Sequence, residues 1–245
     1  MVEFLKRQNK ADLAYIYNKR DSDQAPIVFL GGFRSDMMGT KAEFLSDLCE
    51  KHARSYLRFD YSGHGQSGGQ FEDCVLSDWF QDVRDILEGL SIINPILVGS
   101  SMGGWLSLRY IEEHGDNLHG FVGIAAAPNF TRWMTEAFSE TQQADVESQG
   151  YVLAPNDYGD PYVITKALLD DGEKHILLEK ELNFSGGVRL LQGKKDVDVP
   201  WKTAENIAEA LPRANVEVIY REEGNHSLSS DGDLQELARA VESFD

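Results

Sequence analysis

Three features are scarce in this sequence: cysteine, basic residues and long apolar runs. Only Cys49 and Cys74 occur among the 245 residues. No cluster of Cys and His with metal-ligand spacing accompanies them, so no metal site is predicted. A chain of this length can bury a substantial core without a disulfide, and we therefore expect two buried, free thiols.

Basic residues are outnumbered, with 23 Lys and Arg against 41 Asp and Glu and a formal net charge of −18. Nucleic-acid binding needs clustered cations and anionic membranes repel a negative surface, so neither partner is expected. No run approaches the roughly 18 apolar residues of a membrane-spanning helix. Residues 1–20 carry no apolar signal core and no organelle presequence, which predicts a cytoplasmic protein. The oligomeric state is left open.

The remaining composition is that of a globular protein, with 42% hydrophobic and 26% charged residues. Short strand-like runs alternate with longer helical periods. The predicted strands cover residues 13–17, 27–30, 56–59, 96–98, 121–126, 188–191 and 216–220, and residues 2–6 are expected to pair with the first. The predicted helices cover residues 40–51, 76–90, 105–113, 201–211 and 234–244. This alternation predicts an α/β fold, a mostly parallel sheet with helices on both faces.

One stretch interrupts the alternation. Residues 128–186 hold seven aromatic residues, eleven acids and four bases, a net charge of −7. The stretch is too long for a plain loop. At about 150 residues per domain, the chain length also suggests slightly more than one domain. We therefore expect a core formed by residues 1–127 and 187–245, with a small helical cap inserted at 128–186. Extra core helices at the sheet edge are the alternative.

A nucleophile motif follows the predicted strand 96–98. Residues 99–104 read Gly-Ser-Ser-Met-Gly-Gly, which fits G-x-S-x-G with Ser101 at its centre. The glycines two residues on either side leave room for a tight strand-to-helix turn. The helix N-terminus at Met102 would direct free N–H groups towards a developing oxyanion. Ser100 lacks flanking glycines at these positions, so Ser101 is the predicted nucleophile.

A serine nucleophile needs a base, and in strand-to-helix motifs of this kind the chain order is Ser, acid, His. Four histidines follow Ser101. His114 lies at a helix end, His119 starts a strand and His175 lies in a polar run of the predicted cap. His226 lies in the loop after the last strand, where the carboxyl ends of parallel strands gather functional groups. His226 is the predicted base.

The acid is expected after the strand 188–191. Asp196 and Asp198 stand two residues apart there. Asp196 is closer to the strand end and is predicted to accept the Nδ1–H of His226, which leaves Nε2 free to face Ser101. Asp198 is interpreted as a turn or cap acid before the next helix.

Two backbone amides are predicted to hold the oxyanion, those of Phe33 and Met102. Gly31-Gly32 ends a strand and lets the backbone turn inwards before Phe33, although the pair could also be only a turn. His64, in the loop Gly63-His64-Gly65, is interpreted as part of a structural corner. No glycine cluster has the pattern of a phosphate-binding loop, so no nucleotide cofactor, or any other cofactor, is expected.

With these residues, the chain resembles the α/β-hydrolases over nearly its whole length outside the cap. Residues 32–42, 58–63 and 99–105 are similar to an abhydrolase-domain branch that includes a mitochondrial palmitoyl-protein thioesterase, also described as an acyl-glucuronide esterase. The resemblance implies an eight-stranded α/β-hydrolase sheet, a small cap over the site, and hydrolysis of esters or acyl thioesters. The chain departs from the branch at Gly31-Gly32, where His-Gly is usual.

The sequence thus predicts a cofactor-free serine esterase or thioesterase acting on a small-molecule or acylated substrate. Ser101, Asp196 and His226 would form the catalytic triad. Two alternatives remain open. The same triad could cleave an amide, peptide or carbon–carbon bond, or the fold could serve a non-catalytic ligand-binding protein.

Overall fold

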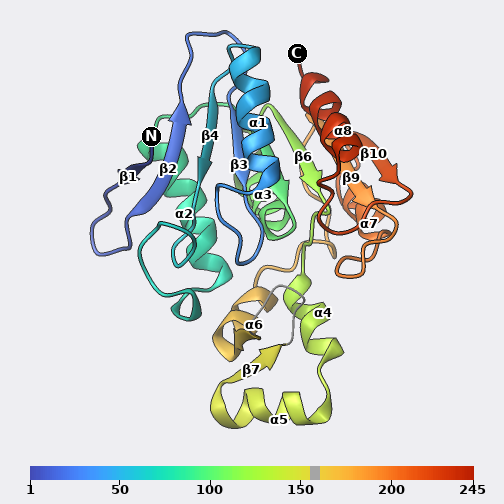
Figure 1. Cartoon of the computed structure of the whole chain (residues 1–245). Helices are drawn as coiled ribbons and strands as arrows, with labels where there is room; N and C mark the ends of the chain where they lie inside the picture. Colours follow the sequence, from blue (N-terminus) through green and yellow to red (C-terminus); the bar gives the residue numbers. More distant parts are fainter. Residues whose placement is uncertain (155–160) are drawn as a thin grey trace.

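The computed structural model describes residues 1–154 and 161–245 (Figure 1). The strands of its main sheet are β1 (Glu3–Leu5), β2 (Leu13–Asn18), β3 (Ile27–Leu30), β4 (Tyr56–Phe59), β5 (Ile96–Ser100), β6 (Gly120–Ile124), β9 (Gly187–Gly193) and β10 (Asn215–Arg221). Within the described residues these eight strands form one sheet in the order β1-β2-β4-β3-β5-β6-β9-β10. β2 runs antiparallel to β1 and β4, and every other neighbouring pair is parallel. The predicted α/β class and eight-stranded, mostly parallel sheet are confirmed.

The central strand β3 is apolar along its whole length because both faces of the sheet are covered. In β3, Ile27 and Phe29 join one apolar cluster, and Val28 and Leu30 join the other. All four side chains are at most 5% exposed. Successive side chains of a strand point to opposite faces, so a strand buried on both sides reads as a continuous apolar run rather than as an alternation.

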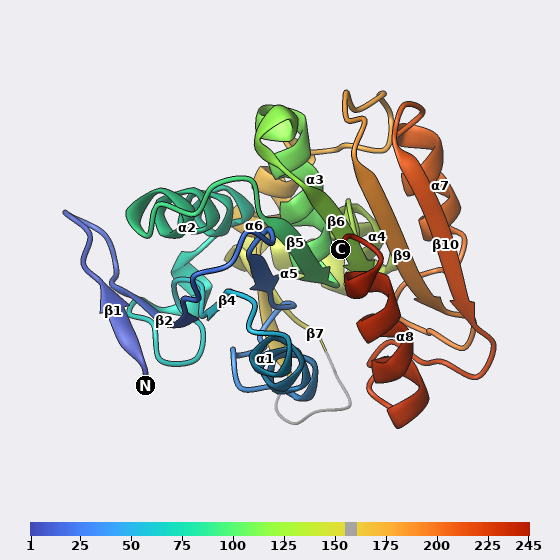
Figure 2. The same ribbon diagram turned by 90° about the horizontal axis from the view of Figure 1, so that it is seen from above.

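Among the described residues, five helices cover the two faces of the sheet, and Figure 2 shows them from above. They are α1 (Thr40–Lys51), α2 (Leu76–Gly89), α3 (Met102–His114), α7 (Thr203–Ala210) and α8 (Asp231–Glu242), with short 3-10 turns η1 (Phe71–Asp73) and η2 (Gly115–Asn117). The apolar residues of α1 and α8 pack in the cluster on one face, and those of α2, α3 and α7 pack in the cluster on the other. This arrangement leaves the carboxyl ends of the parallel strands open for functional loops.

Residues 128–154 and 161–186, the described part of the segment between β6 and β9, lie at the carboxyl ends of the parallel strands (Figure 1). The segment contains α4 (Phe130–Ala137), α5 (Glu140–Gln149), β7 (Tyr151–Ala154), β8 (Tyr162–Thr165) and α6 (Lys166–Glu173). The sequence predicted helices alone, and the antiparallel pair β7–β8 corrects this. These strands have four residues each, too few to establish a period of two. Tyr158, one of the seven aromatic residues counted above, lies outside the described residues.

The end of this segment is attached to the core through Ser77 at the start of α2. The Ser77 N–H donates to Asp171 Oδ2 at 2.8 Å, and the Ser77 hydroxyl lies 3.0 Å from Asp171 Oδ1 and 2.7 Å from His175 Nε2. The Trp105 indole N–H donates to the His175 carbonyl at 3.0 Å. Asp171 and His175, in the polar run of the segment, therefore join it to the core.

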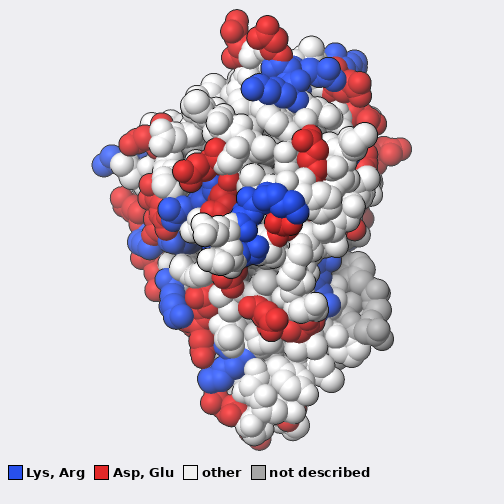
Figure 3. All heavy atoms as spheres, turned by 90° about the vertical axis from the view of Figure 1, so that its left-hand side faces the viewer, with Lys and Arg blue, Asp and Glu red and all other residues white. Residues whose placement is uncertain are grey.

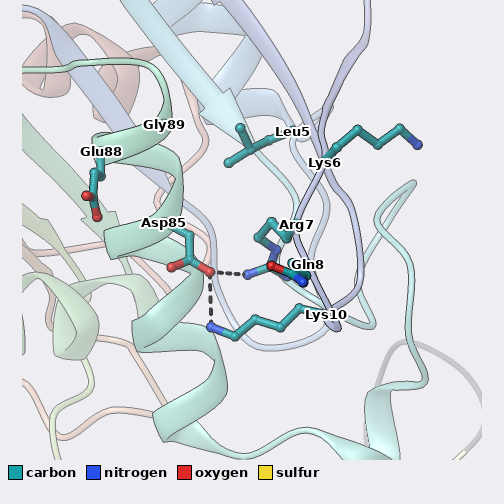
Figure 4. A pocket seen from close by; sticks show the side chains of 8 residues that line it. All are labelled: Leu5, Lys6, Arg7, Gln8, Lys10, Asp85, Glu88 and Gly89. Atoms are coloured by element: carbon teal, nitrogen blue, oxygen red, sulfur yellow. Dashed lines mark hydrogen bonds and ion pairs between the residues drawn. The ribbon is translucent and has the colours of Figure 1, made fainter.

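The hairpin β1–β2 is joined to α2 by a buried arginine (Figure 4). The Arg7 guanidinium bonds Asp82 Oδ1 at 2.6 Å, Asp85 Oδ2 at 2.8 Å and Ser62 Oγ at 2.9 Å. Asp82 in turn accepts from the Ser62 N–H at 2.7 Å. Removing one partner of such a buried network would leave an uncompensated charge, so the network specifies how the loop after β4 lies on α2.

Both cysteines are free and buried, as the sequence predicted. Burial raises the pKa of each thiol to about 12, which keeps both in the unreactive thiol form. Among the described residues, no helix has the length and apolar character needed to cross a bilayer.

A buried histidine occupies the loop after β4. The His64 side chain contacts the rings of Tyr61, Phe71 and Trp79 at centroid distances of 5.0 to 5.5 Å, and the residue is 3% exposed. Burial lowers its pKa from 6.5 to about 4, because a charged imidazolium is poorly solvated in this aromatic cage. The folded protein therefore holds His64 neutral at pH 7.

This depressed pKa predicts a pH-dependent loss of stability. Between pH 6.5 and about 4 the unfolded chain binds a proton at His64 that the folded chain does not, so this contribution is present above pH 6.5 and is lost as the pH falls. Urea unfolding should show that wild type loses about 3 kcal/mol more than His64→Gln between pH 7.5 and pH 4. Equal losses in the two proteins would show that His64 does not resist protonation.

Candidate active site

Ser101 lies on the sharp turn between β5 and α3. Its φ of 52° and ψ of −115° are unusual for a residue with a side chain. Three backbone bonds maintain this conformation. The Ser101 N–H donates to the Ile124 carbonyl at 2.9 Å, and the Ser101 carbonyl accepts from Gly104 at 2.9 Å and Ala127 at 3.0 Å. The local strain is thus compensated by the neighbouring strand and helix.

The glycines on either side of Ser101 are required by close backbone approach. A Cβ at Gly103 would lie 2.0 Å from the Leu30 carbonyl oxygen, and one at Gly99 would lie 2.4 Å from the Gly103 carbonyl oxygen. These are contacts with backbone, which cannot move aside as a flexible side chain can. The spacing G-x-S-x-G therefore follows from the packing of the α3 N-terminus against the ends of β3 and β5.

His226 reaches Ser101 from the loop after β10. Its Nε2 lies 3.1 Å from Ser101 Oγ, and its side chain is 22% exposed. The Asn225 carboxamide oxygen accepts from the Ser227 and Leu228 N–H groups at 3.1 and 3.3 Å, which closes an Asx turn around the histidine. The Lys41 ammonium donates to the Ser227 carbonyl at 2.6 Å and ties this loop to α1.

Asp196 completes the chain of contacts. Its Oδ2 lies 2.9 Å from His226 Nδ1 and accepts from the Gln192 carboxamide at 3.2 Å. Its Oδ1 accepts from the N–H groups of Asp198 and Val199, each at 2.9 Å, and its side chain is fully buried. Four hydrogen-bond partners thus surround one buried carboxylate and fix its orientation towards His226.

The loops that carry the acid and the histidine are tied to each other. The Lys194 N–H donates to the Arg221 carbonyl and the Lys195 N–H to the Gly224 carbonyl, each at 2.9 Å. A Cβ at Gly193 would lie 2.3 Å from the Gly224 carbonyl oxygen, so the two loops approach as closely as glycine allows. This contact fixes the distance between Asp196 and His226.

One group of potential metal ligands is present among the described residues. Asp196, Asp198 and His226 bring one ligand atom each within 4.8 Å of one another. Two of these residues already bond each other, and the Asp198 side chain is exposed. The hydrogen bonds of Asp196 and His226 account for their placement here, and nothing further in the geometry indicates a cation.

The amides predicted for an oxyanion hole lie beside Ser101. Met102 is the first residue of α3, where N–H groups have no partner within the helix. A Cβ at Gly32 would lie 3.4 Å from the Ser101 Cβ, which places the loop leading to Phe33 against the serine. Among the described residues, neither the Phe33 nor the Met102 N–H donates to a backbone or side-chain acceptor.

A hollow of about 370 Å³ opens above Ser101 and His226. Its charged lining residues are Arg34, Asp36 and Lys41. The Arg34 guanidinium pairs with Glu72 at 2.6 Å, and burial lowers the pKa of Lys41 to about 8. Its remaining lining residues are Phe29, Gly32, Phe33, Ser35, Gly39, Thr40, Ala42, Ser100, Tyr162 and Ser227.

The structure brings together Ser101, Asp196 and His226, the three residues that the sequence singled out, although they are far apart in the chain. Ser100 ends β5 and is buried. His175 bonds Ser77 instead. No motif in the sequence indicates that Lys41 lines the hollow and binds the loop that carries His226. The sequence also predicted only a structural corner at His64, whose ring accepts the Arg34 N–H beside the site.

Comparison with known proteins agrees with this geometry. Residues 27–240 match the alpha/beta hydrolase family. The mitochondrial palmitoyl-protein thioesterases ABHD10 of Bos taurus and Homo sapiens are 33% and 32% identical over 244 residues, covering 98% of this chain and 79% of each relative.

Solved structures of hydrolases are also similar to this chain. A putative hydrolase from Agrobacterium vitis S4 has a TM-score of 0.93 and 33% identity, covering 100% of this chain and 97% of the other. Mouse alpha/beta hydrolase domain-containing protein 10 has a TM-score of 0.91 and 31% identity, covering 99% and 97%.

One expectation is overturned by these comparisons. The sequence predicted a cytoplasmic protein, but relatives that match 98% of the chain are mitochondrial thioesterases. The prediction of a cytoplasmic location was therefore wrong. It rested on the absence of a recognisable leader in residues 1–20, and such an absence says little about where a folded hydrolase works.

The nucleophile turn, the sheet order and the similarity to thioesterases over 98% of the chain lead to one conclusion. The chain belongs to the alpha/beta hydrolase family and is an ester-hydrolysing enzyme.

Proposed function

We propose that the protein is a serine hydrolase that cleaves carboxylic esters or acyl thioesters through an acyl-enzyme. The observation that carries this proposal is the hydrogen-bonded chain Asp196–His226–Ser101, with contacts of 2.9 and 3.1 Å. A nucleophile within reach of a base, and a base oriented by an acid, are what covalent acyl transfer requires.

The first half-reaction forms the acyl-enzyme. Ser101 Oγ attacks the acyl carbon while its proton passes to His226 Nε2, and the carbonyl electron pair moves onto oxygen. The amides of Phe33 and Met102 donate to this oxyanion. When the tetrahedral intermediate collapses, the alcohol or thiol leaves with the proton from His226. Asp196 stabilises the imidazolium throughout.

The second half-reaction repeats these steps with water. His226 takes a proton from the water as it attacks the acyl carbon, and the acid product leaves as Ser101 Oγ regains its proton. Neither half-reaction consumes a cofactor. The same two amides hold the charge of both tetrahedral intermediates.

We also propose that residues 128–186 act as a cap on a core formed by residues 1–127 and 187–245. Phe33 supports this division, because its ring packs against Phe71 of the core at 4.9 Å and against Phe130 and Tyr162 of the segment at 5.5 and 6.0 Å. These aromatic contacts beside Ser101 favour a substrate with an apolar acyl group over one with a polar acyl group. The substrate class we propose is an acylated small molecule or an acylated thiol, in keeping with the thioesterase relatives.

Substitution of the nucleophile should abolish turnover. Ser101→Ala should lower kcat by a factor on the order of 10⁶, because no other group can carry the acyl chain. A fluorophosphonate probe should label wild type and not the variant. Near-normal turnover, or persistent labelling, in a folded Ser101→Ala protein would contradict the assignment.

The two aspartates after β9 provide a matched pair. Asp196→Asn should lower kcat by about 10⁴, because an amide in place of the carboxylate favours the wrong tautomer of His226. Asp198→Asn keeps the backbone N–H that bonds Asp196 and should stay within about threefold of wild type. Steady-state kinetics on one neutral ester measures both effects, and reversed effects would make Asp198 the functional acid.

Charge should shape the choice of leaving group. Segment 128–186 carries −7 of the total −18. The basic residues visible on the face that bears β1 are interspersed with acidic ones (Figure 3). At low salt an acyl-CoA should therefore show about 3- to 10-fold lower kcat/KM than a neutral thioester of equal chain length, and added salt should narrow the difference. Equal values at low salt would contradict this expectation.

A further inference from the structure

The loop that carries Phe33 is held by side chains from a second loop, residues 60–67. The Tyr61 hydroxyl donates to the Gly31 carbonyl at 3.2 Å. The Arg34 N–H donates to His64 Nε2 at 3.1 Å, and the Met37 N–H donates to Asp60 Oδ1 at 2.7 Å. Three side chains of one loop thus bind the backbone of the other at its start, middle and end.

His64 is fixed in one tautomer by these contacts. Since Nε2 accepts the Arg34 N–H, the ring proton lies on Nδ1, which donates to the Ser62 carbonyl at 3.2 Å. The depressed pKa keeps the ring neutral, so the acceptor remains available at neutral pH. An apolar ring could fill the space inside the aromatic cage, but it could not accept the hydrogen bond from the Arg34 N–H.

The backbone that His64 binds is a strained turn. The Gly32 carbonyl accepts from the Ser35 N–H at 3.2 Å, which closes a turn over residues 32–35. Within it, Arg34 has a φ of 56° and Phe33 does not have a positive φ. This is the type II pattern, whose third position is normally glycine. A residue with a side chain disfavours this positive φ, so the Arg34 backbone keeps the conformation only while another group holds its N–H in place.

The turn also decides the direction of the Phe33 N–H. This N–H shares a planar trans peptide with the Gly32 carbonyl, so the two point in opposite directions. The Gly32 carbonyl is bound by both the N–H and the hydroxyl of Ser35, at 3.2 and 2.8 Å. As long as the turn is kept, the Phe33 N–H points away from Ser35 and cannot rotate freely.

We propose that His64 is a positioning residue for the oxyanion hole, holding the turn 32–35 in its strained form through the Arg34 N–H. The inference rests on the proposed function of Ser101 and Phe33. Without the acceptor, nothing offsets the preference of Arg34 for negative φ, so residues 33–35 leave the turn, the Ser35 bonds to the Gly32 carbonyl are lost, and the Phe33 amide loses its fixed direction. His64 touches neither substrate nor reacting atoms.

The variants His64→Phe and His64→Gln test this role. Phenylalanine keeps the ring contacts and removes the acceptor, whereas the glutamine carboxamide oxygen reaches the position of Nε2. On a neutral ester, His64→Phe should lower kcat about 10- to 100-fold with little change in KM, less than the loss of an oxyanion donor itself. His64→Gln should restore most of kcat. His64→Asn reaches only the Nδ1 position and serves in place of His64→Phe if that protein does not fold.

A matched thionoester separates positioning from general damage. Its sulfur is a weaker hydrogen-bond acceptor, so its turnover depends less on the two amides. The ester-to-thionoester ratio of kcat/KM should fall about tenfold in His64→Phe and recover in His64→Gln. A damaged core would slow both substrates equally, and an unchanged ratio in a folded His64→Phe protein would overturn the inference.

Arg34→Gly gives an independent check, since glycine adopts the positive φ without help. In the Arg34→Gly background, the added His64→Phe change should lower kcat less than about threefold relative to Arg34→Gly alone. An undiminished effect there would also overturn the inference.

Ser101→Ala is assayed in parallel, and ester turnover that survives it refutes the proposed function itself. If Ser101→Ala is inactive, the ester-to-thionoester ratio and the comparison in the Arg34→Gly background decide whether His64 positions the oxyanion hole.

Discussion

The structure depends on one close approach, between the first turn of α3 and the end of β3. With Gly103 against the Leu30 carbonyl, where a Cβ would come within 2.0 Å, the helix begins directly over the sheet. Ser101 must then adopt a positive φ, and its side chain stands at the carboxyl edge of the parallel strands. The other functional loops are arranged around this fixed point. Their precision matters because a displacement of about 1 Å can cost a large factor in rate.

Each loop around Ser101 is held by a neighbouring loop as well as by its own turns. The acid and histidine loops bond each other through Lys194 and Lys195. The loop before α1 is bound by residues 60–67, and that loop is in turn held through Ser62 by Asp82 of α2 and by Arg7. Contacts from the hairpin β1–β2 and from α2 therefore stabilise the loop that in turn binds the residues beside Ser101. The strain at Ser101 and Arg34 is offset by these contacts outside the site.

The fold and the candidate site could be predicted from the sequence where a local residue pattern is required by packing or by backbone geometry. Buried parallel strands read as apolar runs, and the turn around Ser101 requires glycines at fixed spacing. Chain order then pointed to Asp196 and His226. Two results had weaker signals in the sequence. The pair β7–β8 is too short for its periodicity to show, and the bond between His64 and Arg34 joins loops 30 residues apart. Such contacts depend on how the loops pack, which local patterns do not encode.

The central claim is that an acyl group passes through Ser101, and mass spectrometry of the quenched reaction tests it most directly. An activated long-chain ester is mixed with the enzyme and stopped in acid while the first turnover is under way. The intact protein should gain the mass of one acyl group less one hydrogen, the gain should lie on the peptide that contains Ser101, and Ser101→Ala should show none. An acyl group found on another residue, or retained by Ser101→Ala, would contradict this claim.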